Sequence, residues 1–346
     1  MAVALVSALA HIDRAAFGHN VRSLIRTASP ARVWVAIKAN AYGHGMLELA
    51  DVAVSAGADG LAVLDVPAAL ALRSSGITVP LFVWLHGVQT DFTAAVAANL
   101  EIGVSTREQL ESAARAPGLA RVHLKVDTGL HRNGFAVADW DQICAEARAL
   151  QDAGQITVAG VWSHLADTSA EADAAARAIF TRAVETAINT AGLTPEYLHL
   201  AASSAAISEP ESRFSLVRIG IAAYGISPFD DRDGRALGLR PVMSLTASVE
   251  SVHGESATIS AGWADGIPQV PSGVARVTIN GVRHQVAQVE AHHMEIVVGS
   301  EPVTVGETAV IFGHDGPTAE EWAEWTGTIG DEIVTSVPSH TRRVSN

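Results

Sequence analysis

The sequence has one cysteine, Cys144, among its 346 residues. A single cysteine excludes an internal disulfide and any metal site built from several thiolates. Charged residues make up only 17% of the chain, with 23 basic against 37 acidic side chains. Because no run of five or more lysines and arginines occurs, we expect no nucleic-acid partner and no attraction to an anionic membrane surface.

Long apolar runs are also missing, although 48% of the residues are hydrophobic. No window reaches the roughly 18 uninterrupted apolar residues that a membrane span needs. The first segment, MAVALVSALAHID, has no basic residues before its apolar run and reaches Asp13 early, which is more typical of a strand than of a signal peptide. We therefore expect a soluble, cytoplasmic protein with a large core.

Short apolar runs alternate with alanine-rich segments of helical spacing over residues 8–228. The runs are VWVAI, GLAVL, PLFVWL, EIGVS, RVHLKV, TVAGVWSH and YLHLA, with further strands expected at 8–12 and 216–220. The helical segments include 45–56, 66–74, 106–116, 140–153 and 172–191. Buried strands separated by amphipathic helices predict an α/β fold with a parallel sheet. About eight or nine such units favour a (β/α)8 TIM barrel over a doubly wound open sheet.

The pattern changes after the segment DDRDG at 230–234. From there to the end, alternating Val, Ile and Thr runs are broken by Gly and Pro, which predicts an all-β domain with one short helix near 319–325. We therefore assign 8–228 to the barrel. Residues 1–7 and 229–346 are assigned to a C-terminal β domain.

Polar residues follow many of the expected barrel strands. They are Lys38, Lys125 with Arg132, His164, His199 with Ser203, and Arg218 with Gly220. The carboxyl ends of the strands build the active site of a barrel enzyme. This set, rich in positive charge, predicts a site for a small anionic cofactor or substrate.

The segment VWVAIKANAYGHG (33–45) resembles the motif of the alanine racemase family that contains the pyridoxal 5'-phosphate (PLP) lysine. Five further segments match in the same order: KVDTGLHRNGF (125–135), WSHLADTS (162–169), HLAASSAA (199–206), FSLVRIGIAAYGISP (214–228) and SAGWADGIP (260–268). The resemblance covers essentially the whole chain. It implies a barrel with a C-terminal β domain, L-alanine/D-alanine interconversion on a small amino-acid substrate, and a homodimer with shared active sites.

Carried over residue by residue, the resemblance makes Lys38 the lysine that forms a Schiff base with PLP. It assigns the phosphate to four residues: Tyr42, Ser203, Gly220 and Ile221. It puts Arg218, supported by His164, at the pyridine nitrogen. Arg132 is implied beside the phenolic oxygen and the substrate carboxylate, steadied by Lys125, which the family often carbamylates.

The chemistry of these residue types agrees with such roles. A lysine at the wall of an apolar barrel loses solvation, so its pKa falls and the neutral amine can add to an aldehyde. An arginine does not readily protonate a pyridine nitrogen. PLP whose ring nitrogen is unprotonated is a weaker electron sink, and a weaker sink suits proton transfer better than transamination.

The chain departs from the family pattern at several positions. Trp263 in SAGWADGIP stands where the family has a tyrosine, the second base, which reaches in from the partner subunit. An indole N–H donates a hydrogen bond but has no usable basicity. The other departures are Glu290, Ala291 and His292 for a Cys-Met-Asp run, Asp331 for a tyrosine, and Ala202 for an asparagine. The cofactor side is thus largely retained, and the substrate side is rewritten.

Three hypotheses follow. The first is a racemase in which His292, or less favourably His293, replaces the missing base, since an imidazole titrates near neutral pH. The second is a PLP enzyme with a changed substrate or reaction, in which Lys38 exchanges the α-proton on one face. The third is a PLP-binding relative without turnover. Retention of Lys38, Arg132 and Arg218 together argues against the third.

Several simpler interpretations stay open beside the catalytic ones. Lys125 could pair with a nearby acid, and Arg218 could belong to a structural ion pair. His199 and Ser203 could be local capping groups. The surrounding motif disfavours Lys38 as a mere strand cap.

Two further interpretations concern histidines. His44 is more typical of a turn or packing histidine than of a catalyst. His292 and His293 are adjacent on an expected strand, where neighbouring side chains point to opposite faces. That geometry disfavours a shared metal, and we expect no metal site.

Overall fold

The computed structural model describes residues 8–346, which form two compact units. The barrel unit comprises residues 21–38 and 53–220. The β unit comprises residues 8–20, 39–52 and 221–346. The assignment of 1–7 to the β domain lies outside the described residues.

The barrel unit contains eight parallel strands in the order β8-β7-β6-β5-β4-β3-β2-β9. They are β2 (Arg32–Ala36), β3 (Gly60–Val63), β4 (Leu81–Val83), β5 (Glu101–Val104), β6 (Ala120–Lys125), β7 (Ile156–Trp162), β8 (Tyr197–His199) and β9 (Leu216–Ile219). The two ends of the order also meet: the Ser215 N–H donates to the Leu198 carbonyl at 3.2 Å and the Arg218 N–H to the Ala201 carbonyl at 3.1 Å. The fold is the expected (β/α)8 barrel.

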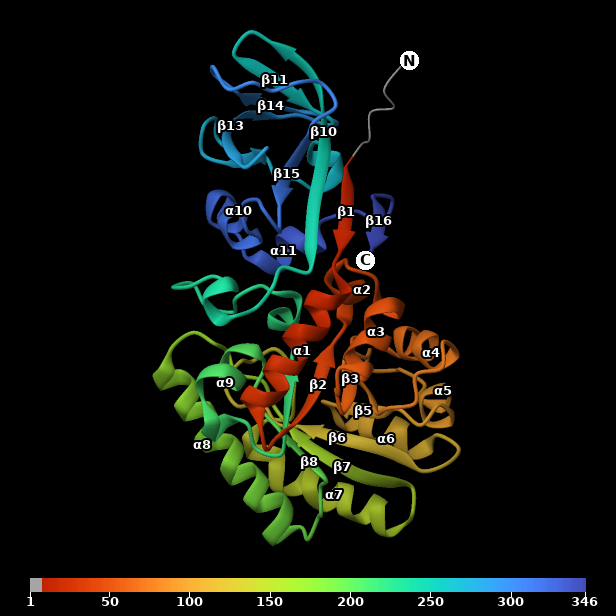
Figure 1. The fold of residues 1–346 in the computed structure, drawn as a ribbon. Coiled ribbons are helices and arrows are strands. Elements are labelled where there is room, and N and C mark those ends of the chain that lie inside the picture. The colour runs from red at the N-terminus through yellow and green to blue at the C-terminus, as the bar shows by residue number, and fades with distance from the viewer. Residues whose placement is uncertain (1–7) are drawn as a thin grey trace. The chain divides into compact units, whose positions relative to one another are not determined.

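The helices of the α/β part alternate with these strands. They are α1 (Arg14–Ala28), α3 (Met46–Ser55), α4 (Val66–Ser74), α5 (Thr93–Ala97), α6 (Arg107–Arg115), α7 (Trp140–Asp152), α8 (Ala170–Glu185) and α9 (Ser203–Ser208), with short turns at Val137–Asp139, Thr186–Thr190 and Pro210–Ser212. Figure 1 shows α4–α8 around the outside of the strands. Asp65, Thr106 and Ser169 each cap a helix by accepting a backbone N–H, which explains where those helices begin.

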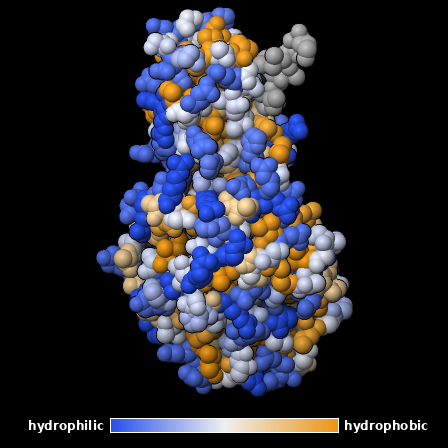
Figure 2. All heavy atoms as spheres, viewed as in Figure 1, coloured by the Kyte–Doolittle hydropathy of each residue, from blue (hydrophilic) through white to orange (hydrophobic). Residues whose placement is uncertain are grey.

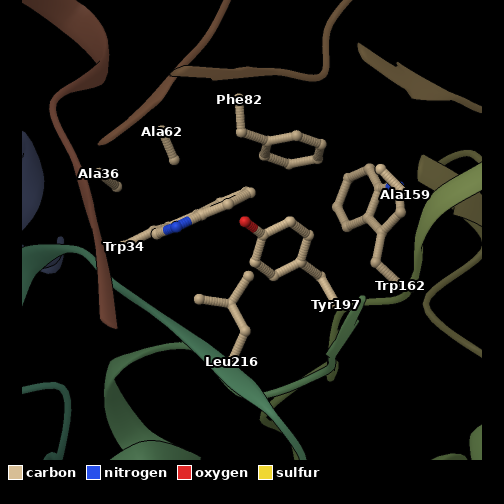
Figure 3. Close-up of a cluster of buried hydrophobic side chains, with 8 residues drawn as sticks. All are labelled: Trp34, Ala36, Ala62, Phe82, Ala159, Trp162, Tyr197 and Leu216. Atoms are coloured by element: carbon tan, nitrogen blue, oxygen red, sulfur yellow. The ribbon is translucent and has the colours of Figure 1, made fainter. Parts of the chain in front are cut away.

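Aromatic side chains fill the interior of the barrel. Trp34, Phe82, Trp162 and Tyr197 converge there from four different strands (Figure 3). Glycine on a neighbouring strand makes the room: a Cβ on Gly60 would lie 2.5 Å from the Trp34 indole nitrogen. The barrel is thus a packed core in which large rings fill the space that glycine leaves free.

The β unit is built on one mostly antiparallel sheet, in the order β11-β14-β13-β12-β15-β10-β1-β16. Its strands are β1 (Leu9–Ile12), β10 (Met243–His253), β11 (Ser256–Ile259), β12 (Arg276–Ile279), β13 (Val282–Val289), β14 (Met294–Val297), β15 (Thr308–Phe312) and β16 (Arg342–Ser345). The helix expected near 319–325 is α10 (Ala319–Thr326), and a second helix, α11 (Gly330–Thr335), was not expected. Short turns lie at η4 (Ile221–Tyr224), η5 (Arg235–Leu237) and η6 (Trp263–Asp265).

The strand expected at 8–12 as part of the barrel belongs instead to the sheet of the β unit. There β1 pairs antiparallel with β10, with Leu9 opposite Thr246, and parallel with β16. Its burial alternates residue by residue. A strand with only one buried face is typical of an antiparallel sheet, whereas barrel strands are buried on both faces.

Hydrophilic and apolar residues are mixed over the surface viewed in Figure 2. Large exposed apolar side chains include Leu85, Trp263 and Ile329. Over residues 8–346, none of the helices combines the length and apolar character needed to cross a membrane. In the same part of the chain, His, Cys, Asp and Glu side chains do not gather in threes that could hold a metal ion.

Candidate active site

The parallel register brings the ends of three barrel strands to one level. Lys125 at the end of β6 lies opposite Trp162 of β7, which in turn lies opposite His199 of β8. Lys38 follows β2 directly after the buried Ile37. The carboxyl ends of the strands therefore carry the residues that the sequence placed there.

His164 lies among four basic side chains. Burial lowers its pKa well below the ordinary value, and the positive charges of Arg218, Arg132, Lys125 and Lys38 lower it further. The Arg218 Nη2 atom lies 3.2 Å from His164 Nδ1. Because a guanidinium only donates, this imidazole nitrogen accepts. His164 is thus neutral within a cationic cluster.

Arg218 is buried and donates to neutral groups. Its Nη2 donates to the carbonyls of Ser163 at 2.8 Å and Leu200 at 3.0 Å, and its Nη1 lies 3.0 Å from His199 Nδ1. Among the ion pairs of residues 8–346, none includes Arg218. Burial and the charge of Arg132 lower its pKa to about 9. The structural ion-pair interpretation is therefore wrong.

Lys125 is buried on the same side of the barrel. Burial, followed by the charges of Arg132 and Arg218, lowers the pKa of its amine to about 7. The amine donates to the side-chain oxygen of Asn133 and lies 4.7 Å from the centre of the Trp162 ring. The hydrogen-bond partner of Lys125 is therefore an amide and not an acid, which was the simpler interpretation of the sequence. With a pKa of about 7, the neutral and charged forms of the Lys125 amine are both accessible near pH 7.

Two of the four predicted phosphate residues meet in the barrel unit. The Gly220 N–H donates to Ser203 Oγ at 3.0 Å. Ser203 begins α9, but the residue at the cap position is Ala202, whose side chain makes no cap hydrogen bond. Ser203 and His199 bond to residues at the end of β9 that are 17 and 19 positions away in the chain, so neither is a local capping group.

A left-handed turn follows Lys38 in the chain. Residues 39–42 all have φ between 50 and 56°, a conformation that costs L-residues roughly 1–2 kcal/mol each. The buried His44 holds this turn, because its Nδ1 donates to the carbonyls of Ala41 at 2.9 Å and Tyr42 at 2.8 Å. Burial lowers its pKa to about 4. His44 is the structural turn residue that the sequence favoured.

The other predicted cofactor residues belong to the β unit. Tyr42 is buried, and its ring centre lies 4.8 Å from that of Tyr224. Burial, and then the carboxylate of Asp331, raises the pKa of the Tyr42 hydroxyl. Ile221 is buried at the start of η4. The charge of Asp331, at a position where the resemblance implies a tyrosine, therefore acts on a predicted phosphate residue.

Trp263 and the rewritten segment at 290–292 lie side by side in the β unit. The Trp263 N–H donates to the Glu290 carbonyl at 2.8 Å, and the Ala264 N–H donates to the Ala291 carbonyl at 2.9 Å. The Trp263 side chain is 53% exposed. Two segments that are far apart in sequence, 263–264 and 290–291, are thus joined by backbone hydrogen bonds.

His292 and His293 lie in the connection between β13 and β14, not on a strand as expected. This turn reverses the chain, because the Glu290 N–H donates to the His293 carbonyl at 2.9 Å. His293 Nε2 lies 3.2 Å from Glu290 Oε2, whereas the His292 side chain is exposed.

Sequence reasoning missed two buried polar residues beneath the cluster, His123 and Glu101. His123 Nδ1 lies 2.8 Å from His199 Nε2, and His123 Nε2 lies 3.0 Å from Glu101 Oε2. A signal was present, since Arg121, His123 and Lys125 occupy alternate positions of one barrel strand. Three basic side chains on one face of a buried strand indicate a polar interior.

The barrel residues fit the cofactor that the resemblance implies. Four basic side chains act on the pKa of His164, which accepts from Arg218, and such donors suit an anion. PLP carries a phosphate of about −1.5 to −2 charge, and its aldehyde needs an amine such as that of Lys38. The hydroxyl of Ser203 and the backbone of Gly220 add uncharged groups suited to phosphate oxygens.

Comparisons with known proteins agree with this geometry. The family model described as "Alanine racemase, N-terminal domain" matches residues 12–228, and "Alanine racemase, C-terminal domain" matches residues 246–345. An alanine racemase of Mycolicibacterium smegmatis is 39% identical over 96% of this chain and 93% of its own. One of Salinispora tropica is 38% identical over 94% of both chains.

Solved structures give the same result. The alanine racemase from D-cycloserine-producing Streptomyces lavendulae superimposes with a TM-score of 0.93 at 34% identity, over 99% of this chain and 97% of its own. That of Streptomyces coelicolor A3(2) has a TM-score of 0.93 at 36% identity, over 98% of both chains. The chain belongs to the alanine racemase family.

Proposed function

We propose that the protein is a cytoplasmic, PLP-dependent amino-acid racemase that interconverts L- and D-alanine. The observation that carries the proposal is the cluster of Lys38, Lys125, Arg132 and Arg218 around neutral His164. PLP, when bound, supplies an electron sink that acidifies the α-carbon of an amino acid. The names of the relatives, all alanine racemases, support alanine as the substrate.

The barrel residues take distinct roles in this proposal. Lys38 holds the cofactor and, once its amine is free, removes or returns the α-proton on one face of the substrate. Arg132, whose side chain is exposed, binds the substrate carboxylate, for which a guanidinium is the best-matched donor. Arg218 would donate to the ring nitrogen and would leave that nitrogen unprotonated.

The opposite face needs a second base, and Trp263 cannot provide it. We assign that role to His292. Its exposed imidazole follows Ala291, whose carbonyl is bonded to the Trp263 loop at 2.9 Å. As the resemblance implies, the β unit would reach the barrel of a partner subunit in a homodimer. The indole of Trp263 favours a second candidate, in which Lys38 alone exchanges the proton or a different substrate is used.

The test supplies L-alanine and D-alanine separately to the PLP-loaded protein in deuterated water. Inversion of both enantiomers with α-deuterium uptake supports the racemase. Exchange of one enantiomer without inversion supports the second candidate and excludes the first. No exchange with either enantiomer, in a sample whose visible absorbance reports bound PLP, excludes alanine as the substrate.

Two variants identify the second base. His292→Ala should lower racemisation at least about 100-fold, the usual contribution of a positioned acid–base group, while one-face exchange by Lys38 continues. His293→Ala is the matched control, because its imidazole already pairs with Glu290. Trp263→Tyr should raise the inversion rate, since it restores a phenol at the family's position. An unchanged rate in His292→Ala excludes this histidine.

A further inference from the structure

A chain of hydrogen bonds runs through the barrel unit from Arg218 to Glu101. Arg218 Nη1 lies 3.0 Å from His199 Nδ1, and His199 Nε2 lies 2.8 Å from His123 Nδ1. His123 Nε2 then lies 3.0 Å from Glu101 Oε2. Both imidazoles are 0% exposed. We call these four residues the relay.

The donors and acceptors of the relay can be arranged in only one way. The Arg218 guanidinium has N–H groups and no acceptor, so His199 Nδ1 must accept. Neutral His199 then carries its proton on Nε2 and donates to His123 Nδ1. His123 in turn carries its proton on Nε2 and donates to Glu101. The reverse order would set two N–H groups against each other between His199 and Arg218.

The carboxylate fixes the far end of the relay. Burial alone would raise the pKa of Glu101, but its hydrogen bonds with His123 and Arg121 outweigh burial and hold the pKa below the usual value. Arg121 Nε donates to Glu101 Oε1 at 2.7 Å. Glu101 is therefore an ionised acceptor, which matches the donor at the Arg218 end.

The walls around the relay leave the imidazoles little room to turn. The Trp162 ring stacks on His199 at 5.7 Å, and the Tyr197 ring stacks on His123 at 5.6 Å. Both aromatic rings belong to the core cluster of Figure 3. On the neighbouring strand, a Cβ at Gly160 would lie 2.2 Å from His123 Nδ1. The core thus holds both rings in one orientation.

We propose that His123 and Glu101 are positioning residues for the proposed reaction, acting on Arg218 through His199. Glu101 supplies the negative charge. His123 donates to Glu101 and accepts from His199, so that His199 presents an acceptor to Arg218. Arg218 is thereby held as a charged donor with one fixed orientation. Because Arg218 is already oriented before the cofactor binds, binding does not carry the free-energy cost of ordering its side chain. This inference rests on the proposed PLP site, and it assigns the residues that orient that site's ring-nitrogen donor.

The first test uses the protein without cofactor, so it does not depend on the proposed function. Histidine-selective ¹⁵N NMR at pH 7 should show His123 and His199 as neutral imidazoles with the proton on Nε2. Assignment uses the variants His123→Gln and His199→Gln. A proton on Nδ1 of either ring, or a doubly protonated ring, overturns the relay.

The second test compares PLP affinities, measured by quenching of tryptophan fluorescence without substrate. In His123→Gln the amide keeps the order, accepting from His199 and donating to Glu101, so the affinity should stay within about 3-fold. His123→Met breaks the order and should weaken binding at least about 10-fold. The matched control is Glu196→Gln, which removes a carboxylate 3.4 Å from Arg121 that touches neither histidine, and should match the wild type.

Equal affinities for His123→Gln and His123→Met overturn the positioning role. If His123→Met does not fold, a loss of affinity of more than about 10-fold in His123→Gln overturns it instead. A wild-type protein that binds no PLP overturns the proposed function, and the NMR result on the cofactor-free protein still decides whether the relay exists.

Discussion

Polar groups are held in opposite ways in the interior of the barrel unit and on the surface of the β unit that Trp263 and residues 290–292 form. In the barrel, Arg218 and His199 are at most 7% exposed and bonded to partners on other strands. In the β unit, Trp263 is 53% exposed, and the backbone of its loop donates to the carbonyls of Glu290 and Ala291. A buried polar network constrains every member, whereas a surface side chain held by its backbone can be exchanged at little cost to folding.

Among the positions where the resemblance implies a departure, Trp263 lies on this exposed surface. Replacing a member of the relay would leave a buried donor or acceptor without a hydrogen-bond partner. The loop at Trp263 is held by backbone hydrogen bonds and by Gly266 with its φ of 85°, so a change of the exposed side chain should leave it intact. The contrast can be tested by substitutions in each region.

The largest expected effect is at Lys38. Lys38→Ala should abolish covalent retention of PLP, because the cofactor's aldehyde needs this amine. The measurement is the mass of the intact protein after incubation with PLP and borohydride reduction. The wild type should gain one pyridoxyl adduct that maps to Lys38. An equal adduct at another lysine in the wild type would contradict the assignment.

A paired substitution compares the two regions directly. Arg218→Leu should lower the free energy of unfolding by about 2–4 kcal/mol, because His199 and two carbonyls lose their donor. Trp263→Phe should change it by less than about 0.5 kcal/mol, since the indole is largely exposed. Urea unfolding of the cofactor-free proteins gives both values, and similar losses in the two variants would refute the contrast.

The pH dependence of stability sharpens the description of the barrel interior. Lys125 has a pKa of about 7 in the folded protein, against 10.5 ordinarily. Between these values the unfolded chain binds more protons, so stability should rise with pH by at most about 1.4 kcal/mol per unit. Below pH 7 both states are protonated, and the cost of the buried charge is constant.

Lys125→Met should remove this slope. The measurement is the difference in the free energy of unfolding between wild type and variant, from pH 6 to pH 9. Above pH 7 the free energy of unfolding of the wild type should increase relative to that of the variant. Below pH 7 the difference between the two should be constant. Parallel curves over the whole range would mean that the amine is not titrating in the folded protein.

The smallest expected effect concerns Ala202, where the resemblance implies an asparagine. This residue holds the cap position of α9 without a side-chain hydrogen bond. Ala202→Asn should stabilise the protein by about 0.5–1 kcal/mol, because asparagine can accept a backbone N–H of the first turn. Thermal unfolding of the cofactor-free protein measures it, and a lower melting temperature would show that the asparagine does not fit.

The sequence predicted the class of the barrel and most of its strands because near-continuous apolar runs and helical spacing are local patterns. The same local reasoning misplaced β1, since a short strand does not encode which sheet it joins. It also put His292 and His293 on a strand, although the Glu290–His293 backbone bond makes a turn there. Pairing between distant segments decided the place of β1, and a local turn decided that of the two histidines.

For the site, the sequence by itself determined which residues follow the strands, and hence the cluster of basic side chains and the family. Only the tertiary structure decided the relay, whose successive members are 22, 76 and 19 residues apart in the chain. It also decided the left-handed turn after Lys38, which His44 holds. The direction of a buried hydrogen bond depends on which donor and acceptor meet in space, and no local pattern carries that information.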